Sequence, residues 1–237
     1  MINLKEFEVL ILAGGKGSRL KKISGNIPKP IMGINNKLFL HYILDILDRL
    51  GFETVSISLC FNSQYFIKVL GHKYQNLKID YIVEKKALDT GGAIINSVRY
   101  LKKKYLLVMN GDSYPDMEFR KYLSDYHKEY EVFIALNKKI NNTKRFGSVS
   151  IDKNNRVLEF NEKSQLKTDY INSGIYIFKR NIFEKLPLQK ISLEKELFKY
   201  FIKTKKFYSW PFVKKLLDIG TPESFYKASD YLRGVKK

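Results

Sequence analysis

Residues 8–20 read EVLILAGGKGSRL, and this stretch decides the fold. An apolar run ends at Leu12 and leads into a loop with glycine at three of four positions, Gly14, Gly15 and Gly17. Such a run is typical of a buried parallel strand that turns into a helix. Glycines let the backbone come close to a phosphate and point its N–H groups at it. The stretch therefore predicts an anion-binding loop at the carboxyl end of a strand, where open α/β sheets bind ligands.

Strand and helix patterns alternate outward from this loop. Strands are predicted at 8–12, 54–59, 78–83 and 105–109, and helices at 38–50, from 62 to about 71, and at 90–101. Further strands are predicted at 146–151, 156–160, 170–178 and up to 218–220, with helices at 192–203 and from 221 onward. Repeated β–α–β units favour an open sheet covered by helices on both faces. We expect a Rossmann-like α/β fold with a mostly parallel mixed sheet, in a single domain over 1–237 with halves 1–137 and 138–237.

The charge of the chain indicates an anionic partner. The 237 residues include 43 Lys and Arg against 24 Asp and Glu, which leaves a net charge of +19. Nucleic acid, phosphorylated metabolites and acidic membranes all compete for such a chain. The lysines come in short scattered clusters, without the signature of a known RNA- or DNA-binding motif. We therefore predict no nucleic-acid partner, and a basic nucleic-acid binder stays the weakest of three hypotheses.

The cysteine count and the apolar runs indicate the compartment. Cys60 is the single cysteine, so an internal disulfide is excluded. Lys5, Glu6 and Glu8 interrupt the first apolar stretch, which argues against a secretory signal. The longest charge-free run falls short of the roughly 18 apolar residues that a spanning helix needs. We predict a cytoplasmic protein without membrane insertion.

Two familiar phosphate loops do not match the glycine stretch. A P-loop would need Gly and Ser or Thr where Leu10 and Gly17 stand. The dinucleotide fingerprint loses its third glycine to Leu20. A plain β-to-α turn remains an alternative, but a turn seldom needs three glycines flanked by the cations Lys16 and Arg19.

With Pro28-Lys29-Pro30 further on, the loop resembles the signature of the sugar-1-phosphate nucleotidylyltransferases. Other motifs of that family follow in order along the chain. They are Thr90-Gly91-Gly92-Ala93, Asn110-Gly111-Asp112, Glu162-Lys163, Asn172-x-Gly174 and Asp218-Ile219-Gly220-Thr221-Pro222. The resemblance implies the nucleotide-diphospho-sugar transferase fold, with 1–137 as the nucleotide-binding half and 138–237 as the sugar-phosphate-binding half.

The loops around Lys29 and Thr90 most resemble the D-glycero-D-manno-heptose 1-phosphate guanylyltransferases. The resemblance implies an enzyme that transfers a nucleoside monophosphate from an NTP, GTP in that group, to a sugar 1-phosphate. Pyrophosphate is released, and the NDP-sugar serves surface polysaccharide synthesis. A uridylyl- or cytidylyltransferase for another phosphorylated molecule stays an alternative. A non-catalytic nucleotide-sugar-binding protein is less favoured, because it has little need for the cations and carboxylates of the motifs.

Such chemistry requires no general base, because a phosphate monoester with a second pKa of about 6 is already anionic at neutral pH. This agrees with the absence of His41, His72 and His127 from every motif. Positioned cations and a metal ion stabilise the charge instead. The predicted catalytic residues are Arg19, Lys29, Asp112, Lys163 and Asp218.

The resemblance assigns the remaining site residues. Nucleotide-binding residues are Leu12, Ala13, Gly14, Gly15, Lys16, Gly17, Ser18, Arg19, Lys29, Gly91 and Gly92. Sugar-phosphate-binding residues are Gly111, Glu162, Lys163, Asn172 and Gly174. Asp112 and Asp218 are the predicted ligands of Mg²⁺, which proteins usually hold through one or two carboxylates plus substrate phosphates.

For each assignment a plainer interpretation exists. Lys29 resembles a solvated loop lysine, Asp112 a turn former, Asp218 a residue that caps the last helix, and Glu162-Lys163 a surface charge pair. Three residues depart from the family pattern, Asp89 in place of Gly, Ser18 in place of Thr, and Leu216 in place of an aromatic residue. These leave the base and the sugar open, and the sequence also leaves a homo-oligomer open.

Overall fold

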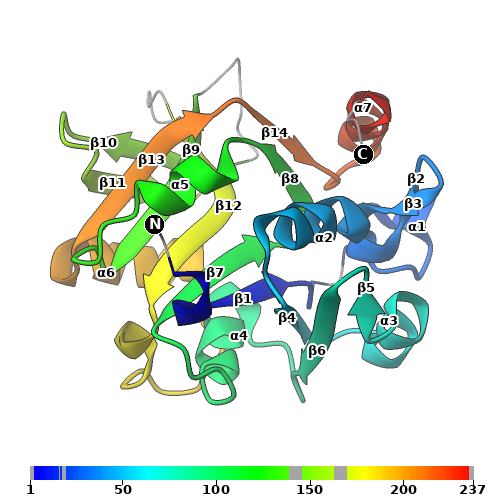
Figure 1. The fold of residues 1–237 in the computed structure, drawn as a ribbon, viewed down its shortest axis with the longest axis horizontal. Helices are drawn as coiled ribbons and strands as arrows, with labels where there is room; N and C mark the ends of the chain where they lie inside the picture. The colour runs from blue at the N-terminus through cyan, green and yellow to red at the C-terminus, as the bar shows by residue number, and fades with distance from the viewer. Residues whose placement is uncertain (1–2, 16, 18–19, 139–145, 163–169, 235–237) are drawn as a thin grey trace.

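The structure is a computed structural model that describes residues 3–15, 17, 20–138, 146–162 and 170–234 (Figure 1). Its main strands are β1 (Phe7–Leu12), β4 (Thr54–Leu59), β5 (Lys73–Tyr74), β6 (Leu77–Val83), β7 (Tyr105–Asn110), β9 (Val132–Lys138), β10 (Ser148–Ile151), β11 (Val157–Asn161), β12 (Tyr170–Lys179) and β13 (Phe207–Val213). Two small ribbons are formed by β2 (Gly33–Ile34) with β3 (Lys37–Leu38), and by β8 (Ser113–Asp116) with β14 (Lys215–Asp218).

The helices are α1 (Lys21–Ser24), α2 (Phe39–Leu50), α3 (Ser63–Leu70), α4 (Asp89–Ser97), α5 (Phe119–Ser124), α6 (Phe198–Thr204) and α7 (Pro222–Arg233). Short 3₁₀ turns are η1 (Leu4–Glu6), η3 (Lys29–Ile31) and η4 (Arg180–Phe183), and η5 (Leu193–Leu197) is a π-helical turn that leads into α6. Among the described helices, none has the length and apolar character needed to cross a membrane.

One open mixed sheet organises the described residues. Its strand order is β11-β10-β12-β7-β1-β4-β6-β5, and β9 pairs with β12 and with β13. The pairs β7–β1, β1–β4 and β4–β6 are parallel, as predicted for the first half of the chain. β12 runs antiparallel to β7, β9 and β10, so the second half continues the same sheet. The predicted fold class is confirmed, whereas the single domain with two halves stays a prediction.

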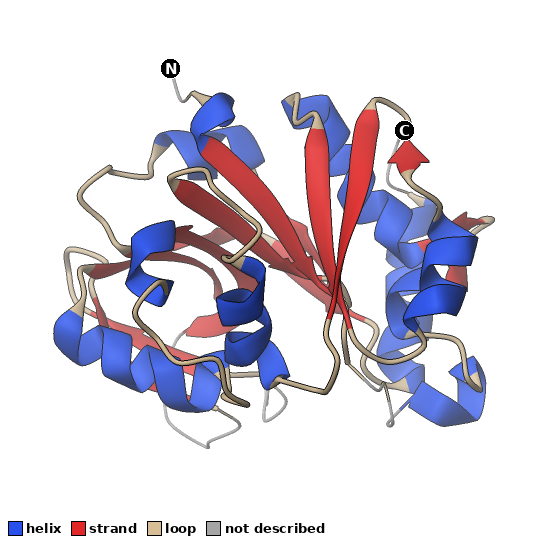
Figure 2. Cartoon of the chain, turned by 90° about the horizontal axis from the view of Figure 1, so that it is seen from below, coloured by secondary structure: helices blue, strands red, loops and turns tan. Residues whose placement is uncertain are grey.

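The central strands β1 and β7 are mostly apolar because both faces of the sheet are covered. Figure 2 shows helices on both sides of the strands. Val9 of β1 packs into the core beneath α2, while the next residue, Leu10, packs into the core on the opposite face with residues of α4 and α6. β7 repeats this alternation with Leu107 and Leu106. Alternate side chains of a strand point to opposite faces, so a doubly covered strand needs an unbroken apolar run.

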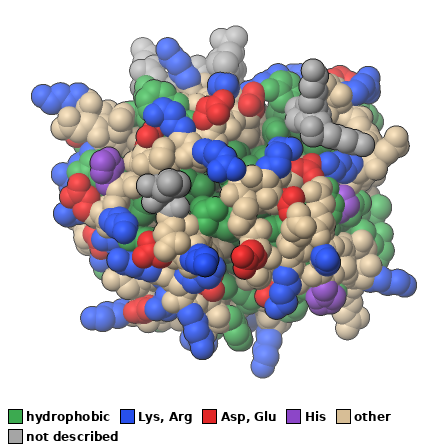
Figure 3. Space-filling model, viewed as in Figure 1, with side chains coloured by type: hydrophobic (Ala, Val, Ile, Leu, Met, Phe, Trp, Pro, Cys, Tyr) green, Lys and Arg blue, Asp and Glu red, His purple; other side chains and the backbone are tan. Residues whose placement is uncertain are grey.

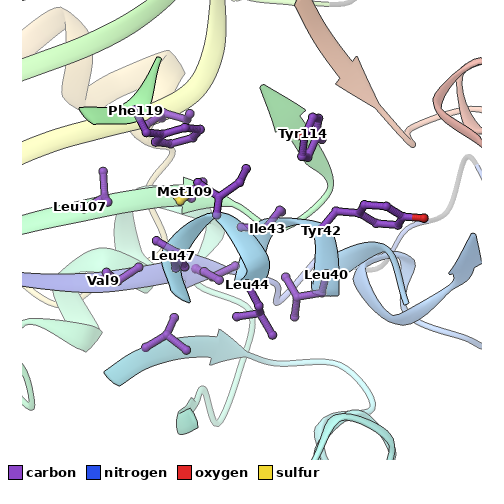
Figure 4. Close-up of a cluster of buried hydrophobic side chains, with 14 of the residues drawn as sticks. Val9, Leu40, Tyr42, Ile43, Leu44, Leu47, Leu107, Met109, Tyr114 and Phe119 are labelled. Atoms are coloured by element: carbon purple, nitrogen blue, oxygen red, sulfur yellow. The ribbon is translucent and has the colours of Figure 1, made fainter. Parts of the chain in front are cut away.

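α2 covers one face through a helical stripe (Figure 4). Leu40, Ile43, Leu44 and Leu47 are all fully buried, at the spacing that the sequence predicts for one helix face. The helix ends at Gly51, whose φ of +91° is a left-handed conformation that favours glycine, as expected for a residue that terminates a helix. This helix orders the core behind the carboxyl ends of β1 and β7, where the predicted site lies.

Removing part of this stripe should destabilise the protein strongly. Leu44→Ala leaves a cavity among residues that cannot close in on it, so we expect the free energy of unfolding to fall by about 2–5 kcal/mol. Val69→Ala on α3 is the control, because Val69 is 39% exposed at the surface, and its truncation should change the free energy by less than about 1 kcal/mol. Urea denaturation followed by circular dichroism measures both. Equal effects of the two substitutions would contradict the assigned core.

Candidate active site

The glycine loop leaves β1 at the carboxyl edge of the sheet. Ala13 N–H donates to the carbonyl of Ser58, which extends the pairing of β1 with β4. Gly14 lies against the next wall of the site, because a Cβ there would be 3.2 Å from Glu84 Oε1. A Cβ on Gly15 would meet nothing within 4 Å. Gly14 thus allows a close approach inside the protein, while Gly15 faces open space.

Gly17 makes room for the lysine of the second motif. Its φ is +63°, and a Cβ on it would lie 3.1 Å from Lys29 Cγ. Lys29 begins the η3 turn between two prolines and is only 8% exposed. Its Nζ lies 3.6 Å from Asp112 Oδ2. The loop and Lys29 therefore form one packed unit that holds an ammonium group beside a carboxylate.

Asp112 and Asp218 are brought together by the β8–β14 ribbon. Asp112 follows the end of β7, and Asp218 pairs in register with its neighbour Ser113. Ile219 N–H donates to the Asp112 carbonyl at 3.1 Å, which fixes the two segments to each other. The Asp218 carboxylate accepts a hydrogen bond from Gly220 N–H at 2.8 Å. Two residues 106 positions apart thus lie on neighbouring chain segments, as expected if they serve one site.

This donor set fits a magnesium ion. Carboxylate oxygens are hard ligands of the kind Mg²⁺ prefers, and Mg²⁺ keeps positions for water and substrate phosphates. Among the described residues no group of three or more His, Cys, Asp or Glu side chains is placed to hold a metal. A closed structural metal site of such residues is therefore absent there, and binding of Mg²⁺ by Asp112 and Asp218 stays a prediction.

The predicted sugar-side residues are tied closely to the protein itself. Asn172 is buried, with its Oδ1 accepting from Gly174 N–H at 2.9 Å and its Nδ2 2.7 Å from the Tyr176 hydroxyl. Gly174 adopts a φ of +73°, and a Cβ on it would lie 2.6 Å from the Asn110 side chain. Gly111 likewise lies against the carbonyl of Leu12. These contacts shape the edge between β12, β7 and β1, and direct contact with a sugar stays a prediction.

Gly91 and Gly92 lie inside α4 rather than in an open turn. A Cβ on Gly91 would be 2.9 Å from the carbonyl of Ile191, and one on Gly92 would run into the carbonyl of Gln189. The glycines therefore let the 189–193 segment pack directly on the helix. Their predicted role in nucleotide binding stays a prediction.

A cavity of about 800 Å³ lies beside the glycine loop, Lys29 and Asp112, whereas the described residues Gly91, Gly92, Gly111, Glu162, Asn172, Gly174 and Asp218 are not among its lining residues. Its lining includes Leu12, Ala13, Gly14, Gly15, Gly17, Lys29 and Asp112 from the predicted set. It also includes Asp89, Thr90 and Asn110, which stand in or next to the quoted motifs, and Ser58, Phe61, Glu84, Lys190, Ser192, Glu194 and Lys195, which the sequence did not single out. A cavity of this size is in the range of small-molecule sites. The predicted residues Lys16, Ser18, Arg19 and Lys163 lie outside the described residues.

Glu84 is a site residue that the motifs missed. It follows β6 directly and is buried. Its Oε1 accepts from the Ser58 hydroxyl and its Oε2 from Leu88 N–H, both at 3.0 Å. Burial raises the pKa of Glu84, although the two hydrogen bonds oppose that shift. The signal that could have found it is its place, one residue beyond a parallel strand at the ligand-binding edge.

The backbone conformation at Asp89 accounts for one departure from the family pattern. Its φ is +57°, a left-handed conformation that glycine adopts at no cost and that aspartate tolerates. The side chain lies 3.8 Å from Lys190 Nζ across the cavity entrance. Of the other departures, Leu216 pairs with Pro115 in the β8–β14 ribbon, and nothing in the structure explains its replacement of an aromatic residue.

The three histidines lie away from the cavity lining. His41 stacks on Tyr74 with ring centroids 4.3 Å apart, and burial together with the charge of Lys37 lowers its pKa. His72 and His127 contact Tyr81 and Tyr130. None of the described lining residues of the cavity is a histidine.

The surface charge is dispersed on the face seen in Figure 3. Lys and Arg side chains are spread over this face, with Asp and Glu among them. The cations do not form one continuous stripe in this view. The absence of a nucleic-acid partner stays a prediction.

A family model described as nucleotidyl transferase matches residues 8–234. The chain belongs to the nucleotidyl transferase family. It is 34% identical over 92% of its length to D-glycero-alpha-D-manno-heptose 1-phosphate guanylyltransferase of Campylobacter jejuni, covering 97% of that protein. The protein of the same name from Aneurinibacillus thermoaerophilus is 33% identical, with 95% of this chain and 98% of the relative covered. The predicted family and enzyme class are confirmed.

A solved structure agrees with these relatives. This nucleotidyl transferase is similar to the crystal structure of HddC from Yersinia pseudotuberculosis, with a TM-score of 0.85 and 35% identity, over 95% of this chain and 99% of that one. A second HddC structure, complexed with GMP-PN, superposes with a TM-score of 0.84. The sheet and the order of motifs are therefore those of a nucleotidyl transferase over nearly the whole chain.

The packing of Gly17 on Lys29 can be tested by substitution. Gly17→Ala introduces a Cβ at a left-handed residue and against the Lys29 stem, so we expect the free energy of unfolding to fall by about 1–2 kcal/mol. Gly15→Ala, where nothing lies within 4 Å, should change it by less than about 1 kcal/mol or raise it slightly. Thermal and urea unfolding measure both variants. A Gly17→Ala protein as stable as the wild type would show that the loop is not packed on Lys29.

Proposed function

We propose that this nucleotidyl transferase transfers GMP from GTP to D-glycero-D-manno-heptose 1-phosphate and releases pyrophosphate. The observation that carries the proposal is that Lys29 and Asp112 line the cavity with the glycine loop, while the Asp218 segment pairs next to Asp112. Two curated relatives that match over almost their whole length bear the name of a heptose 1-phosphate guanylyltransferase. The proposal extends their substrate to this chain.

The reaction needs two polyanions held side by side. The sugar phosphate is anionic at neutral pH, so its oxygen attacks the α-phosphorus of GTP without a base. The bond from the α-phosphorus to the bridging oxygen breaks, and the electron pair leaves with pyrophosphate. Gly14, Gly15 and Gly17 would offer backbone N–H groups to the triphosphate, and the Lys29 ammonium would offset charge on the leaving group.

Asp112 and Asp218 would hold Mg²⁺. When bound, the ion would act as a Lewis acid, which reduces the repulsion between negatively charged phosphate groups. Arg19 is proposed to bind the triphosphate, and Lys163 to bind the sugar phosphate. Glu162, Asn172 and Gly174 are proposed to form the sugar pocket, with Gly111 next to it. Positioning and fixed charge then account for catalysis, because the attacking phosphate oxygen carries no proton that a base would have to remove.

The carboxylate of Glu84 is positioned to recognise the nucleotide base by hydrogen bonds. Ser58 and Leu88 fix its two oxygens, so the carboxylate can present its remaining lone pairs to the cavity in one orientation. Guanine offers two adjacent N–H donors, from N1 and from the exocyclic amine, which match the two oxygens of a carboxylate. Adenine presents a lone pair at N1, which a carboxylate would repel. A buried carboxylate therefore favours GTP over ATP.

The reaction is tested by measuring pyrophosphate release with GTP, UTP, CTP, ATP and dTTP, each with Mg²⁺ and either heptose 1-phosphate or mannose 1-phosphate. We expect GTP with the heptose phosphate to react fastest. Turnover with another nucleotide only would replace GTP in the proposal. A protein that binds nucleotides but turns over no pair would instead be a nucleotide-sugar-binding protein.

Asp112→Ala should lower kcat by at least about 100-fold, the order of loss seen when one group that stabilises transition-state charge is removed. The side chain of Asp112 is 41% exposed, so the fold should remain intact by circular dichroism. Asp80→Ala is the matched control, because Asp80 pairs with Lys78 on the exposed edge of β6. Wild-type turnover in Asp112→Ala would remove this residue from the metal site.

Glu84→Gln should reduce the preference for GTP over ATP by about 10-fold or more, because a hydrogen bond to a charged group contributes about 1.5–3 kcal/mol. The preference is measured as the ratio of kcat/KM for the two nucleotides. Glu53→Gln, the same change at an exposed residue, should leave the ratio unchanged. An unaltered ratio in Glu84→Gln would place base recognition elsewhere.

A further inference from the structure

Glu194 is a second carboxylate on the cavity wall that no motif assigned. It lies in the η5 turn, in the second half of the chain, and lines the same cavity as the glycine loop and Asp112. Its Oε2 accepts a hydrogen bond from the Thr90 hydroxyl at 2.5 Å and one from the Ser192 hydroxyl at 3.2 Å. Two donors from different chain segments therefore converge on one oxygen of this side chain.

The direction of these hydrogen bonds is fixed by the backbone. Leu193 N–H donates to Thr90 Oγ1 at 3.0 Å, and Lys195 N–H donates to Ser192 Oγ at 3.1 Å. Each hydroxyl has one hydrogen, and each oxygen already accepts from a backbone N–H. Both hydroxyl hydrogens are thus directed at Glu194, which orients the carboxylate as an acceptor.

The glycine pair of α4 fixes the position of this carboxylate. Gly92 N–H donates to the Ile191 carbonyl at 3.0 Å, and a Cβ on Gly91 would lie 2.8 Å from Leu197 Cδ1 and 3.0 Å from Leu193 N. The backbone of α4 therefore packs directly on the segment that carries Glu194. The two glycines therefore have a structural role, because they let the segment that carries Glu194 pack on α4.

Glu194 also lies in the field of another carboxylate. Burial raises its pKa most, and the charge of Glu162 raises it further, against the effect of the Thr90 hydrogen bond. The two carboxylates repel each other, and neutral hydrogen-bond donors from a ligand would stabilise Glu194 without adding charge of their own. The hydroxyl groups of a sugar are such donors.

We propose that Glu194 accepts hydrogen bonds from hydroxyl groups of the bound sugar phosphate, and that Thr90 is a positioning residue that holds it for this contact. The inference rests on the proposed function, because it names a further residue that selects the sugar. Glu194 lies in the second half of the chain, which also carries Glu162 and the other predicted sugar-side residues Asn172 and Gly174, whereas the glycine loop and Glu84 belong to the first half. The part of the ligand that reaches it is therefore the sugar rather than the guanine.

Substitution of Glu194 and Thr90 separates binding from structure. Glu194→Gln keeps the shape but weakens the acceptor, so we expect KM for heptose 1-phosphate to rise about 10-fold or more, with KM for GTP within about twofold of the wild type. Thr90→Val removes both hydrogen bonds of the hydroxyl and should raise the same KM, whereas Thr90→Ser should restore it. Glu159→Gln, at an exposed position on β11, is the control and should change neither constant.

Calorimetry with heptose 1-phosphate and mannose 1-phosphate separates this inference from the proposed reaction. Weaker binding of these sugar phosphates to Glu194→Gln than to the wild type supports the inference, even if the wild type turns over neither of them. Equal binding by the two proteins would overturn it while guanylyl transfer stands. It is also overturned if the wild type binds neither sugar phosphate. Loss of affinity for GTP alone in Glu194→Gln would overturn it as well, because Glu194 would then contact the ribose of the nucleotide.

Discussion

The site depends on a cation that is held almost out of water beside a carboxylate. Lys29 is 8% exposed, and its ammonium lies 3.6 Å from Asp112. An unpaired buried cation would be costly, and the neighbouring carboxylate of Asp112 offsets part of its charge. Gly17 accepts the lysine stem, and the prolines on either side restrict its backbone. A triphosphate that enters the cavity therefore meets a charge already in place, and little reorganisation is left for the reaction itself.

The fold delivers the other groups to the same edge. The carboxyl ends of the parallel strands β1, β6 and β7 lie along one edge of the sheet, and they supply the glycine loop, Glu84 and Asp112. Asp218 comes from far along the chain and reaches Asp112 through the β8–β14 ribbon. β12 joins the second half of the chain to β7, and Glu194 of the second half lines the same cavity as the glycine loop. One continuous sheet thus connects the glycine loop with the half of the chain to which the proposed sugar contacts belong.

The sequence predicted the parts of this arrangement whose signals are local. Alternating apolar runs predicted β1, β4, β6 and β7, and Gly51 predicted the end of α2, because burial on two faces and a left-handed turn each restrict residue type. The order of the motifs predicted Lys29, Asp112 and Asp218, and the family and the fold class are confirmed. The motifs predicted that Asp112 and Asp218 share one site, but the β8–β14 ribbon that brings them together could not be predicted, because β8 is a short strand without its own pattern. Glu194 could not be predicted from the sequence, because it is held by a hydrogen bond from Thr90, 104 residues away. Gly91 and Gly92 were predicted to bind the nucleotide from their motif, but tight packing of the 189–193 segment on α4 also explains why glycine stands there.

The most direct test of the central claim is a crystal structure of the protein with Mn²⁺, a non-hydrolysable GTP analogue and heptose 1-phosphate, in which anomalous scattering locates the metal. The account predicts a single metal peak within bonding distance of both Asp112 and Asp218 and of phosphate oxygens, with the triphosphate on the glycine loop and within reach of Lys29. A metal bound to neither carboxylate, or a triphosphate seated away from Lys29 and the glycines, would contradict it.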